Sequence, residues 1–329
     1  MTAQYLNAVR TVLDEGTRKE NRTGIDSIST FGVDMRFDLR DGFPLLTTKR
    51  INWFHIVAEN LWFLSGAKNI GFLQKHGIKF WDPWADENGT VPSAYGNFWR
   101  RFPVHDEMDG TGLISGAFND QISWLLAELK RNPMSRRLVV SAWAPGNAQT
   151  SSLPPCHCLF VLNVQNLPTE PRTLVEEENR RILGDLNEVA GMARNALEPT
   201  EPHLCLHLTQ RSCDMGLGVP YNIAGYAFLL SLLAHISGMK PGIFHHTLVD
   251  AHVYTSKPDG SDAEYDHVPA LMEQLDRQPK TLPKLVISPG IQCLEDIDAL
   301  MEQDEETMLS AFNLQGYDPY PRLKMKVAV

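Results

Sequence analysis

An apolar run between residues 221 and 237 constrains the fold more than any other part of the sequence. Its core, residues 227–236, is half the length needed to cross a bilayer. The run therefore predicts a helix that is buried inside a protein core. Strands are predicted before it, over residues 204–209, and after it, where a Gly-bounded strand leads to residues 252–254. A chain of 329 residues can bury one large core or two ordinary ones.

Hydrophobic periodicity predicts further helices and strands along the chain. Apolar residues recur at helical spacing in residues 4–15, 51–64 and 118–131. Residues 27–39 alternate as in a strand with one buried face, and residues 138–143 and 158–164 are β-rich runs typical of a sheet. A charged stretch at residues 166–202 predicts a surface insertion, whose Pro-rich edges should stop both neighbouring strands.

The charge of the chain limits its partners. Its 30 Lys and Arg against 40 Asp and Glu give a formal net charge of −10. Nucleic acids and anionic membranes favour a positive surface, so neither is expected as a partner. An anionic ligand must be bound by arginines clustered locally. The first residues lack the basic and apolar regions of a signal peptide, and we expect a soluble, cytoplasmic protein.

Five cysteines, at positions 156, 158, 205, 213 and 293, are an odd number at irregular spacing. They do not suggest a disulfide framework. The run Cys156-His157-Cys158 suggests a metal site at first sight, but neighbouring residues of a strand point to opposite faces and no second Cys/His pair has zinc spacing. We therefore expect no bound metal.

Cys156 is a candidate nucleophile because Pro154-Pro155 fixes the chain just before an apolar strand. A cysteine reacts as its thiolate, which needs cations or strong donors nearby. Arg22, Arg136, Arg137 and Arg211 are the candidate cations. Taken alone, a single cysteine is more often an inert core residue.

The segment at residues 210–223 favours the reactive interpretation. Arg211 and Ser212 suit a phosphate group, and Asn222 offers a donor and an acceptor that complement the N3–H and O4 edge of uracil. His252 and Tyr254, on one strand face, could hold a sugar hydroxyl.

Two other features allow two interpretations each. From composition alone, Glu59 is either a surface residue of its helix, the favoured choice, or a buried acid. Trp81 and Trp84 lie in a turn-rich loop, where they either form a platform for a ligand or anchor the loop.

Taken together, these motifs resemble the thymidylate synthase family over nearly the whole chain. The resemblance rests on ordered blocks at residues 21–24, 42–50, 59–64, 81–85, 95–96, 135–137, 154–157, 210–222, 250–254 and 316–319. It implies one α/β domain spanning residues 1–329, with a large mixed β-sheet and flanking helices. It also implies a homodimer in which the sheet faces of two subunits pack together.

The resemblance implies the ligands and the residues that bind them. The substrates would be dUMP and 5,10-methylenetetrahydrofolate, with Cys156 adding to C6 of the pyrimidine. The catalytic residues would be Cys156, Glu59, Tyr95, His157, Asn222 and Asp214. The nucleotide would be bound by Arg22, Arg211, Ser212, Gln210, Asn222, His252 and Tyr254, with Arg136 and Arg137 supplied by the partner subunit. The folate would contact Asn52, Trp81, Trp84, Asp214, Leu217, Gly218, Tyr221 and Ala328, and residues 327–329 would close over the site.

The chain departs from the family pattern at several positions. Ser256-Lys257 replaces an Asn-His pair after Tyr254, and the loop up to Val268 is altered. Asn52 and Phe54 stand where His and Arg are common. Besides reductive methylation of dUMP to dTMP, three alternatives stay open: a 5-hydroxymethylase in which water replaces the hydride, a cytidylate-specific enzyme, and an inactive RNA-binding or scaffold protein. The cytidylate enzyme is disfavoured by Asn222, and the inactive protein by the intact Cys156, Arg211 and Glu59.

Overall fold

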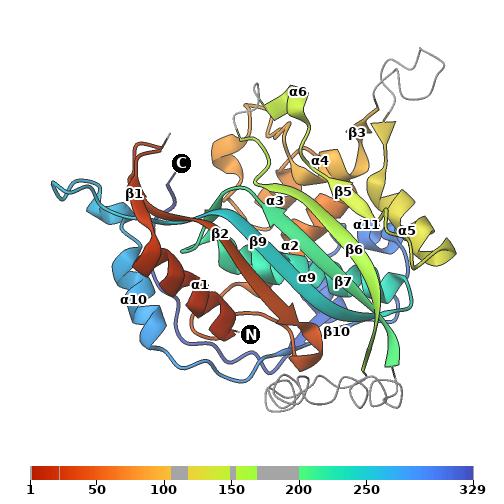
Figure 1. Cartoon of the computed structure of the whole chain (residues 1–329). Coiled ribbons are helices and arrows are strands. Elements are labelled where there is room, and N and C mark those ends of the chain that lie inside the picture. Colours follow the sequence, from red (N-terminus) through yellow and green to blue (C-terminus); the bar gives the residue numbers. More distant parts are fainter. Residues whose placement is uncertain (1, 22, 105–117, 149–152, 169–199, 329) are drawn as a thin grey trace.

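A computed structural model describes residues 2–21, 23–104, 118–148, 153–168 and 200–328. Its main element is a seven-stranded mixed sheet in the order β1-β2-β9-β7-β6-β5, with β8 also paired to β9 (Figure 1). β7 and β8 run parallel to β9, and the other pairs are antiparallel. The strands are β1 (Thr17–Lys19), β2 (Ser27–Asp38), β5 (Val139–Ser141), β6 (His157–Pro168), β7 (Thr200–Gln210), β8 (Cys213–Asp214) and β9 (Lys240–Tyr254).

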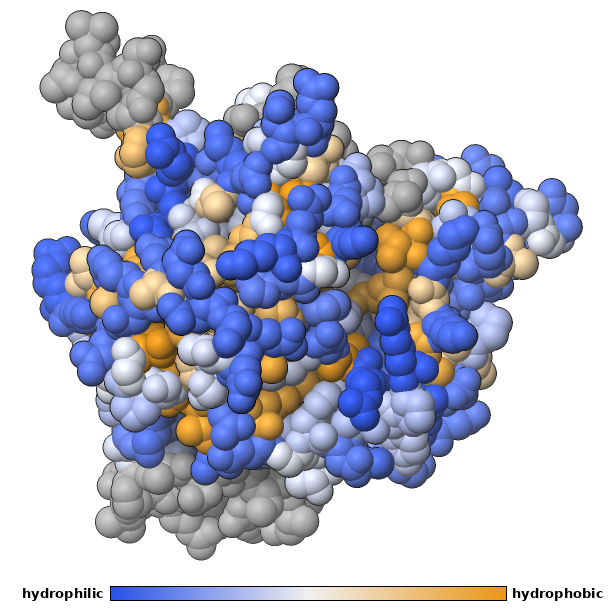
Figure 2. All heavy atoms as spheres, turned by 180° about the vertical axis from the view of Figure 1, so that it is seen from behind, coloured by the Kyte–Doolittle hydropathy of each residue, from blue (hydrophilic) through white to orange (hydrophobic). Residues whose placement is uncertain are grey.

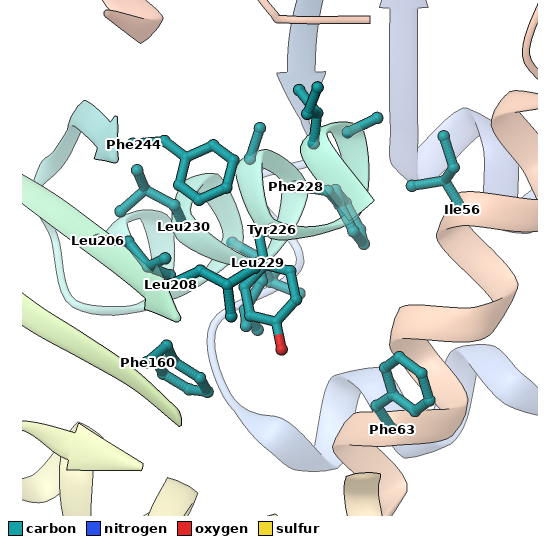
Figure 3. Close-up of a cluster of buried hydrophobic side chains, with 14 of the residues drawn as sticks. Ile56, Phe63, Phe160, Leu206, Leu208, Tyr226, Phe228, Leu229, Leu230 and Phe244 are labelled. Carbon is teal, nitrogen blue, oxygen red and sulfur yellow. The ribbon is translucent and has the colours of Figure 1, made fainter. Parts of the chain in front are cut away.

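Helix α9 (Gly218–Ile236) connects β7 to β9 and fills the core between the sheet and helix α2 (Trp53–Ser65). Figure 3 shows Phe228 and Leu230 of α9 between Phe244 of the sheet and Ile56 of α2. By length and composition alone α9 could cross a membrane, but 83% of its 18-residue apolar window is buried inside the fold, as expected of a core helix.

The remaining elements surround this core. The other α-helices are α1 (Thr2–Glu15), α3 (Gly71–Lys75), α4 (Tyr95–Arg100), α5 (Gln121–Arg131), α6 (Pro145–Ala148), α10 (Val268–Asp276), α11 (Leu294–Met301) and α12 (Glu305–Ala311). Two small sheets pair β3 (Phe102–Pro103) with β4 (Phe118–Asn119) and β10 (Lys284–Ile287) with β11 (Phe312–Gln315). Short 3-10 turns are η1 (Leu39–Asp41), η2 (Asp82–Trp84) and η4 (Ala263–Tyr265). Figure 2 shows the side facing away from the viewer of Figure 1, where apolar side chains reach the surface in patches between polar residues.

The two faces of the sheet differ in burial. Along β7 and β9, buried residues alternate with half-buried ones, so one face is covered and the other is open in a single chain. The open face carries His207 and His245, whose Nδ1 atoms lie 2.8 Å apart, and Phe31 on β2 is 86% exposed.

Most predicted elements are confirmed, and their bounds shift by a few residues. The helix predicted from residue 118 begins at Gln121, because Phe118–Asn119 form β4 and the Asp120 side chain caps the helix by accepting from the Ser123 N–H. β9 is also longer than predicted, since it continues without a break through residues 252–254.

The strands reach further into the Pro-rich edges of the insertion than predicted. β6 continues to Pro168, which pairs with Thr200 of β7. Proline is accepted here because Pro168 ends its strand, and Pro202 precedes His203, the first residue of β7 that pairs with β9. Residues 169–199 of the predicted insertion lie outside the described residues.

Candidate active site

Cys156 lies where the antiparallel strands β6 and β7 place one end of each side by side. Its carbonyl oxygen accepts from the N–H of Arg211, 2.9 Å away, directly after β7. The Arg211 guanidinium donates to the carbonyl oxygens of Pro154 (2.6 Å) and Pro155 (3.0 Å). It also lies 5.5 Å from the ring of Trp143. Arg211 therefore holds the turn that carries the predicted nucleophile.

Tyr95 and His157 form the buried wall behind Cys156. The Cys156 N–H donates to the Tyr95 hydroxyl, 3.1 Å away. The Tyr95 and His157 rings are stacked with centroids 4.5 Å apart. Burial lowers the pKa of His157 to about 3, although Asn222 opposes the shift, so this imidazole is neutral at physiological pH. Burial raises the pKa of Tyr95, so its hydroxyl keeps its proton.

A hydrogen-bonded chain orients Asn222. The Gln210 amide donates to the Asn222 Oδ1 at 3.0 Å and to the Ser212 carbonyl at 3.0 Å. The side-chain oxygen Oε1 of Gln210 in turn accepts from Nε2 of His246, 2.9 Å away. His246 is fully buried, and burial lowers its pKa, so it donates as a neutral ring. The Asn222 oxygen is thus held by Gln210, which fixes the direction of its amide group.

Glu59 is a partly buried acid on α2, and the favoured surface interpretation is wrong. Its Oε1 accepts from Nε1 of Trp81, 2.8 Å away. Burial raises the pKa of Glu59 from 4.5 to about 7, and the hydrogen bond from Trp81 opposes part of this shift. The residues that follow it on α2 include Leu61, Trp62, Phe63 and Leu64, which are all buried. A carboxyl that titrates near neutrality can both accept and donate a proton.

The N-terminal turn of α9 is the accessible end of an otherwise buried helix. The half-buried residues there include the predicted folate contacts Leu217, Gly218 and Tyr221. Trp84 and Trp81 are in ring contact, with centroids 6.3 Å apart. Asn52 is exposed and caps α2, its side chain accepting from the Phe54 N–H at 3.0 Å. Helix capping explains a polar residue at position 52 without any ligand.

Asp214, on β8, is partly buried and surrounded by donors and cations. Its Oδ1 accepts from the Gly216 N–H at 2.8 Å and lies 3.6 Å from Nδ1 of His267. Burial alone would raise its pKa, but the hydrogen bond and charge of His267 outweigh burial and hold the pKa below its ordinary value. Lys49 donates to the Gly216 carbonyl, and burial lowers its pKa to about 7.

The predicted nucleotide residues divide into three groups. Gln210, Arg211, Ser212 and Asn222 lie together beside Cys156. His252 and Tyr254 are in ring contact on β9, with centroids 5.2 Å apart, and β8 pairs with this strand through Asp214 and His252. Arg136 and Arg137 are exposed in the segment before β5. Arg22 and the terminal Val329 lie outside the described residues, and Ala328 is half-buried near the end of the chain.

Sequence reasoning gave no role to three buried residues of this region: Lys49, His246 and His267. The alternation of β9 could have indicated His246, because it places that imidazole on the covered face opposite Leu208, two residues from Gln210 on β7. Within the described ranges, no group of three or more His, Cys, Asp or Glu side chains could hold a metal ion.

The site therefore combines three groups. Cys156 lies on a turn that Arg211 holds, the Asn222 amide is oriented by Gln210, and the Glu59 carboxyl has a pKa of about 7. Comparison with known protein families gives a match over nearly the whole chain. The sequence model of the family described as thymidylate synthase matches residues 3–329. Because the match spans nearly the whole chain, this protein belongs to the thymidylate synthase family.

Proposed function

We propose that this enzyme catalyses the reductive methylation of dUMP to dTMP, with 5,10-methylenetetrahydrofolate as the second substrate. Family membership supports an enzyme that methylates or hydroxymethylates a dUMP-type nucleotide with folate as co-substrate. The observation that carries the proposal is the chain of contacts from Cys156 to Glu59. The Cys156 N–H donates to the Tyr95 hydroxyl, the Tyr95 and Trp81 rings lie 6.0 Å apart, and Trp81 donates to Glu59, whose pKa is about 7.

Cys156 would act as the nucleophile. Its thiolate adds to C6 of the pyrimidine, and C5 then forms a bond to the one-carbon unit of the folate. Loss of the C5 proton and release of the folate amine leave an exocyclic methylene on the ring. The folate supplies the hydride that reduces this methylene, and expulsion of the thiolate then frees the product and restores Cys156.

Glu59 would handle the protons of these steps. With a pKa of about 7, roughly half of its carboxyl groups are ionised at neutral pH, which suits proton transfer to O4 and from C5 through water. His157 would contribute only as a neutral hydrogen-bonding ring, because its pKa of about 3 leaves it uncharged. The proton-transfer role therefore falls on Glu59 and not on His157.

The nucleotide would be recognised by an oriented amide and several arginines. Gln210 fixes the Asn222 amide, which would read the N3–H and O4 edge of uracil. Arg22, Arg211 and Ser212 would bind the phosphate, and their cations would also favour the Cys156 thiolate. Arg136 and Arg137 are exposed and would reach the nucleotide of a second subunit packed against the open sheet face.

Hydroxymethylation is the second candidate, because it shares every step up to the exocyclic methylene. Water must then reach that carbon. The Trp81 ring is buried, at 7% exposure, and residues 327–329 would close over the site. Both features would exclude water and favour the hydride.

One assay tests the proposal. The purified enzyme is incubated with dUMP and 5,10-methylenetetrahydrofolate, and both products are analysed. Formation of dTMP together with dihydrofolate supports the synthase. Formation of 5-hydroxymethyl-dUMP with tetrahydrofolate identifies the second candidate, and neither product would refute both.

The shared site has its own test. A subunit carrying Arg136→Ala and Arg137→Ala is mixed with a Cys156→Ala subunit, each inactive alone. Mixed dimers contain one site with an intact cysteine and intact partner arginines, so activity should return in part. Mixtures that stay inactive, although subunits exchange, would contradict the trans arrangement.

A further inference from the structure

The segment between β9 and α10 replaces the family's Asn-His pair with a longer loop that has its own internal structure. Within it, the Lys257 ammonium pairs with Asp262 at 3.1 Å, and the Ser256 hydroxyl donates to Asp266 at 2.9 Å. The loop then ends at Asp266-His267, directly before α10, where the His267 N–H donates to the Tyr254 carbonyl at 3.0 Å. Asp266 and His267 therefore lie across this loop from Tyr254, and the His267 N–H ties the end of the loop to the end of β9.

This loop holds the C-terminal segment at one residue, Lys326. The Lys326 ammonium lies 2.7 Å from a carboxylate oxygen of Glu264 and 4.4 Å from the centre of the Tyr265 ring. The Lys326 carbonyl accepts from Nε2 of His267, 2.8 Å away. An ion pair, a cation–π contact and a backbone hydrogen bond therefore converge on a single position of the tail.

His267 connects this contact to Asp214. The His267 side chain is fully buried, and its Nδ1 faces the Asp214 carboxylate at 3.6 Å while Nε2 donates to the tail. Gly216 leaves the space for this ring, because a Cβ there would lie 2.4 Å from Nδ1. Burial would lower the pKa of His267, but Asp214 and the Lys326 carbonyl outweigh burial and raise it, which favours a charged ring.

The tail is anchored separately upstream. Arg277 donates to the Pro321 carbonyl at 2.8 Å, and the Tyr320 N–H donates to the Thr47 carbonyl at 2.8 Å. Lys280 pairs with Asp318 at 2.9 Å. These contacts fix the base of the tail, so the contacts at Lys326 decide the position of the last residues.

We propose that Glu264, Tyr265 and His267 form a clamp that positions the C-terminal residues over the folate side of the site, with His267 as the positioning residue that links the tail to Asp214. The inference rests on the proposed function, because Asp214 matters here as a folate contact. The inserted loop supplies the outer part of the clamp and His267 the inner part.

A charge-swap experiment tests the outer part. Deuterium exchange of the C-terminal peptide is compared in the unmodified enzyme, Glu264→Lys, Lys326→Glu and the double variant. Each single change places like charges together, and we expect roughly threefold to tenfold faster exchange, with the double variant close to the unmodified rate. The matched control is Glu201→Gln, which breaks a similar exposed ion pair with Lys240 on the sheet.

Kinetics test the link to the site. In Glu264→Lys and His267→Ala, the KM for the folate should rise by about fivefold or more while the affinity for dUMP is unchanged, because Asp214 lies on the folate side. His267→Gln keeps a donor for the Lys326 carbonyl and should recover much of the loss. If His267 had a purely structural role, its replacement would instead weaken the binding of both substrates, and His267→Gln would not restore it.

The outcomes separate the two proposals. The clamp would be overturned if the C-terminal peptide of the single variants exchanged deuterium at the rate of the unmodified enzyme. It would also be overturned if exchange became faster while the KM for the folate stayed unchanged. An unmodified enzyme that forms neither pyrimidine product would refute the proposed function instead, and the exchange measurement would still decide whether the tail is held at Lys326.

Discussion

The hydrogen bond from Trp81 to Glu59 should set the pH at which the enzyme works. The Trp81 N–H favours the ionised carboxylate, while burial favours the protonated form and raises the pKa to about 7. Trp81→Phe removes the donor and keeps most of the aromatic ring. We therefore expect the pKa of Glu59 to rise further.

The size of this change follows from the geometry. A hydrogen bond to a charged group contributes about 1.5 to 3 kcal/mol, and about 1.4 kcal/mol corresponds to one pKa unit. Water reaches the partly buried Glu59 and replaces part of the lost bond, so we expect the lower end, about one unit. At pH 7 the ionised fraction then falls from about one half to about one tenth, and kcat/KM falls about fivefold.

The assay is the pH dependence of kcat/KM with dUMP and the folate. The acid limb, which reports ionisation of Glu59, should move from about pH 7 to about pH 8, and rates above pH 9 should recover. If Trp81→Phe acted instead by removing a contact with the folate, kcat/KM would fall by the same factor at every pH. Trp84→Phe is the matched control, because Trp84 lies against Trp81 but its indole makes no described hydrogen bond to Glu59. An acid limb that stays in place, or moves to lower pH, would refute the reasoning.

Three further predictions concern single side chains. Cys156→Ala should abolish turnover and spare dUMP binding, measured by calorimetry; normal residual turnover would exclude the covalent step. Asn222→Asp should weaken discrimination against dCMP and allow its turnover, whereas unchanged selectivity in a competition assay would refute the role of Asn222. Glu59→Gln should stabilise the fold at pH 8 by up to about 3 kcal/mol and hardly at pH 4, since the folded state binds the extra proton between pH 4.5 and about 7 and loses stability as pH rises through that range. Urea titrations at both pH values measure this, and equal effects at pH 4 and pH 8 would count against a buried acid.

Periodicity was sufficient to predict the elements that build the sheet and its covering helices. The apolar run at residues 221–237 is α9, and the alternating residues 27–39 are β2. Burial of nearly all sides of α9 requires a continuous apolar run, and burial of one face of β2 requires alternating apolar residues. Both patterns can be recognised in the sequence. Boundaries were less predictable where tertiary pairing overrode local signals, as in the strands that continue past Pro202 and up to Pro168.

The candidate site was only partly predictable from single residues. Glu59 was assigned to the surface on composition, because the Trp81 hydrogen bond that accommodates it joins residues 22 positions apart. Gln210 was placed with the nucleotide by resemblance, but its link to His246 spans 36 positions and depends on the register of β7 against β9. His267 was missed because the inserted loop separates it from Tyr254 in sequence while leaving the two rings 5.6 Å apart.

The hairpin of β6 and β7 has a practical consequence. Cys156 adjoins one end of β6 and Pro168 is its other end, so a strand of 12 residues separates the Cys156 thiol from the far end of β6 by about 40 Å. Changes of length beyond Pro168 are therefore separated from Cys156 by a strand ladder that is paired along its length apart from an irregularity between His157 and Leu159. The same distance makes the segment between Pro168 and Thr200 a suitable place to graft a fluorescent reporter or an affinity handle, since the grafted group would be attached far from Cys156.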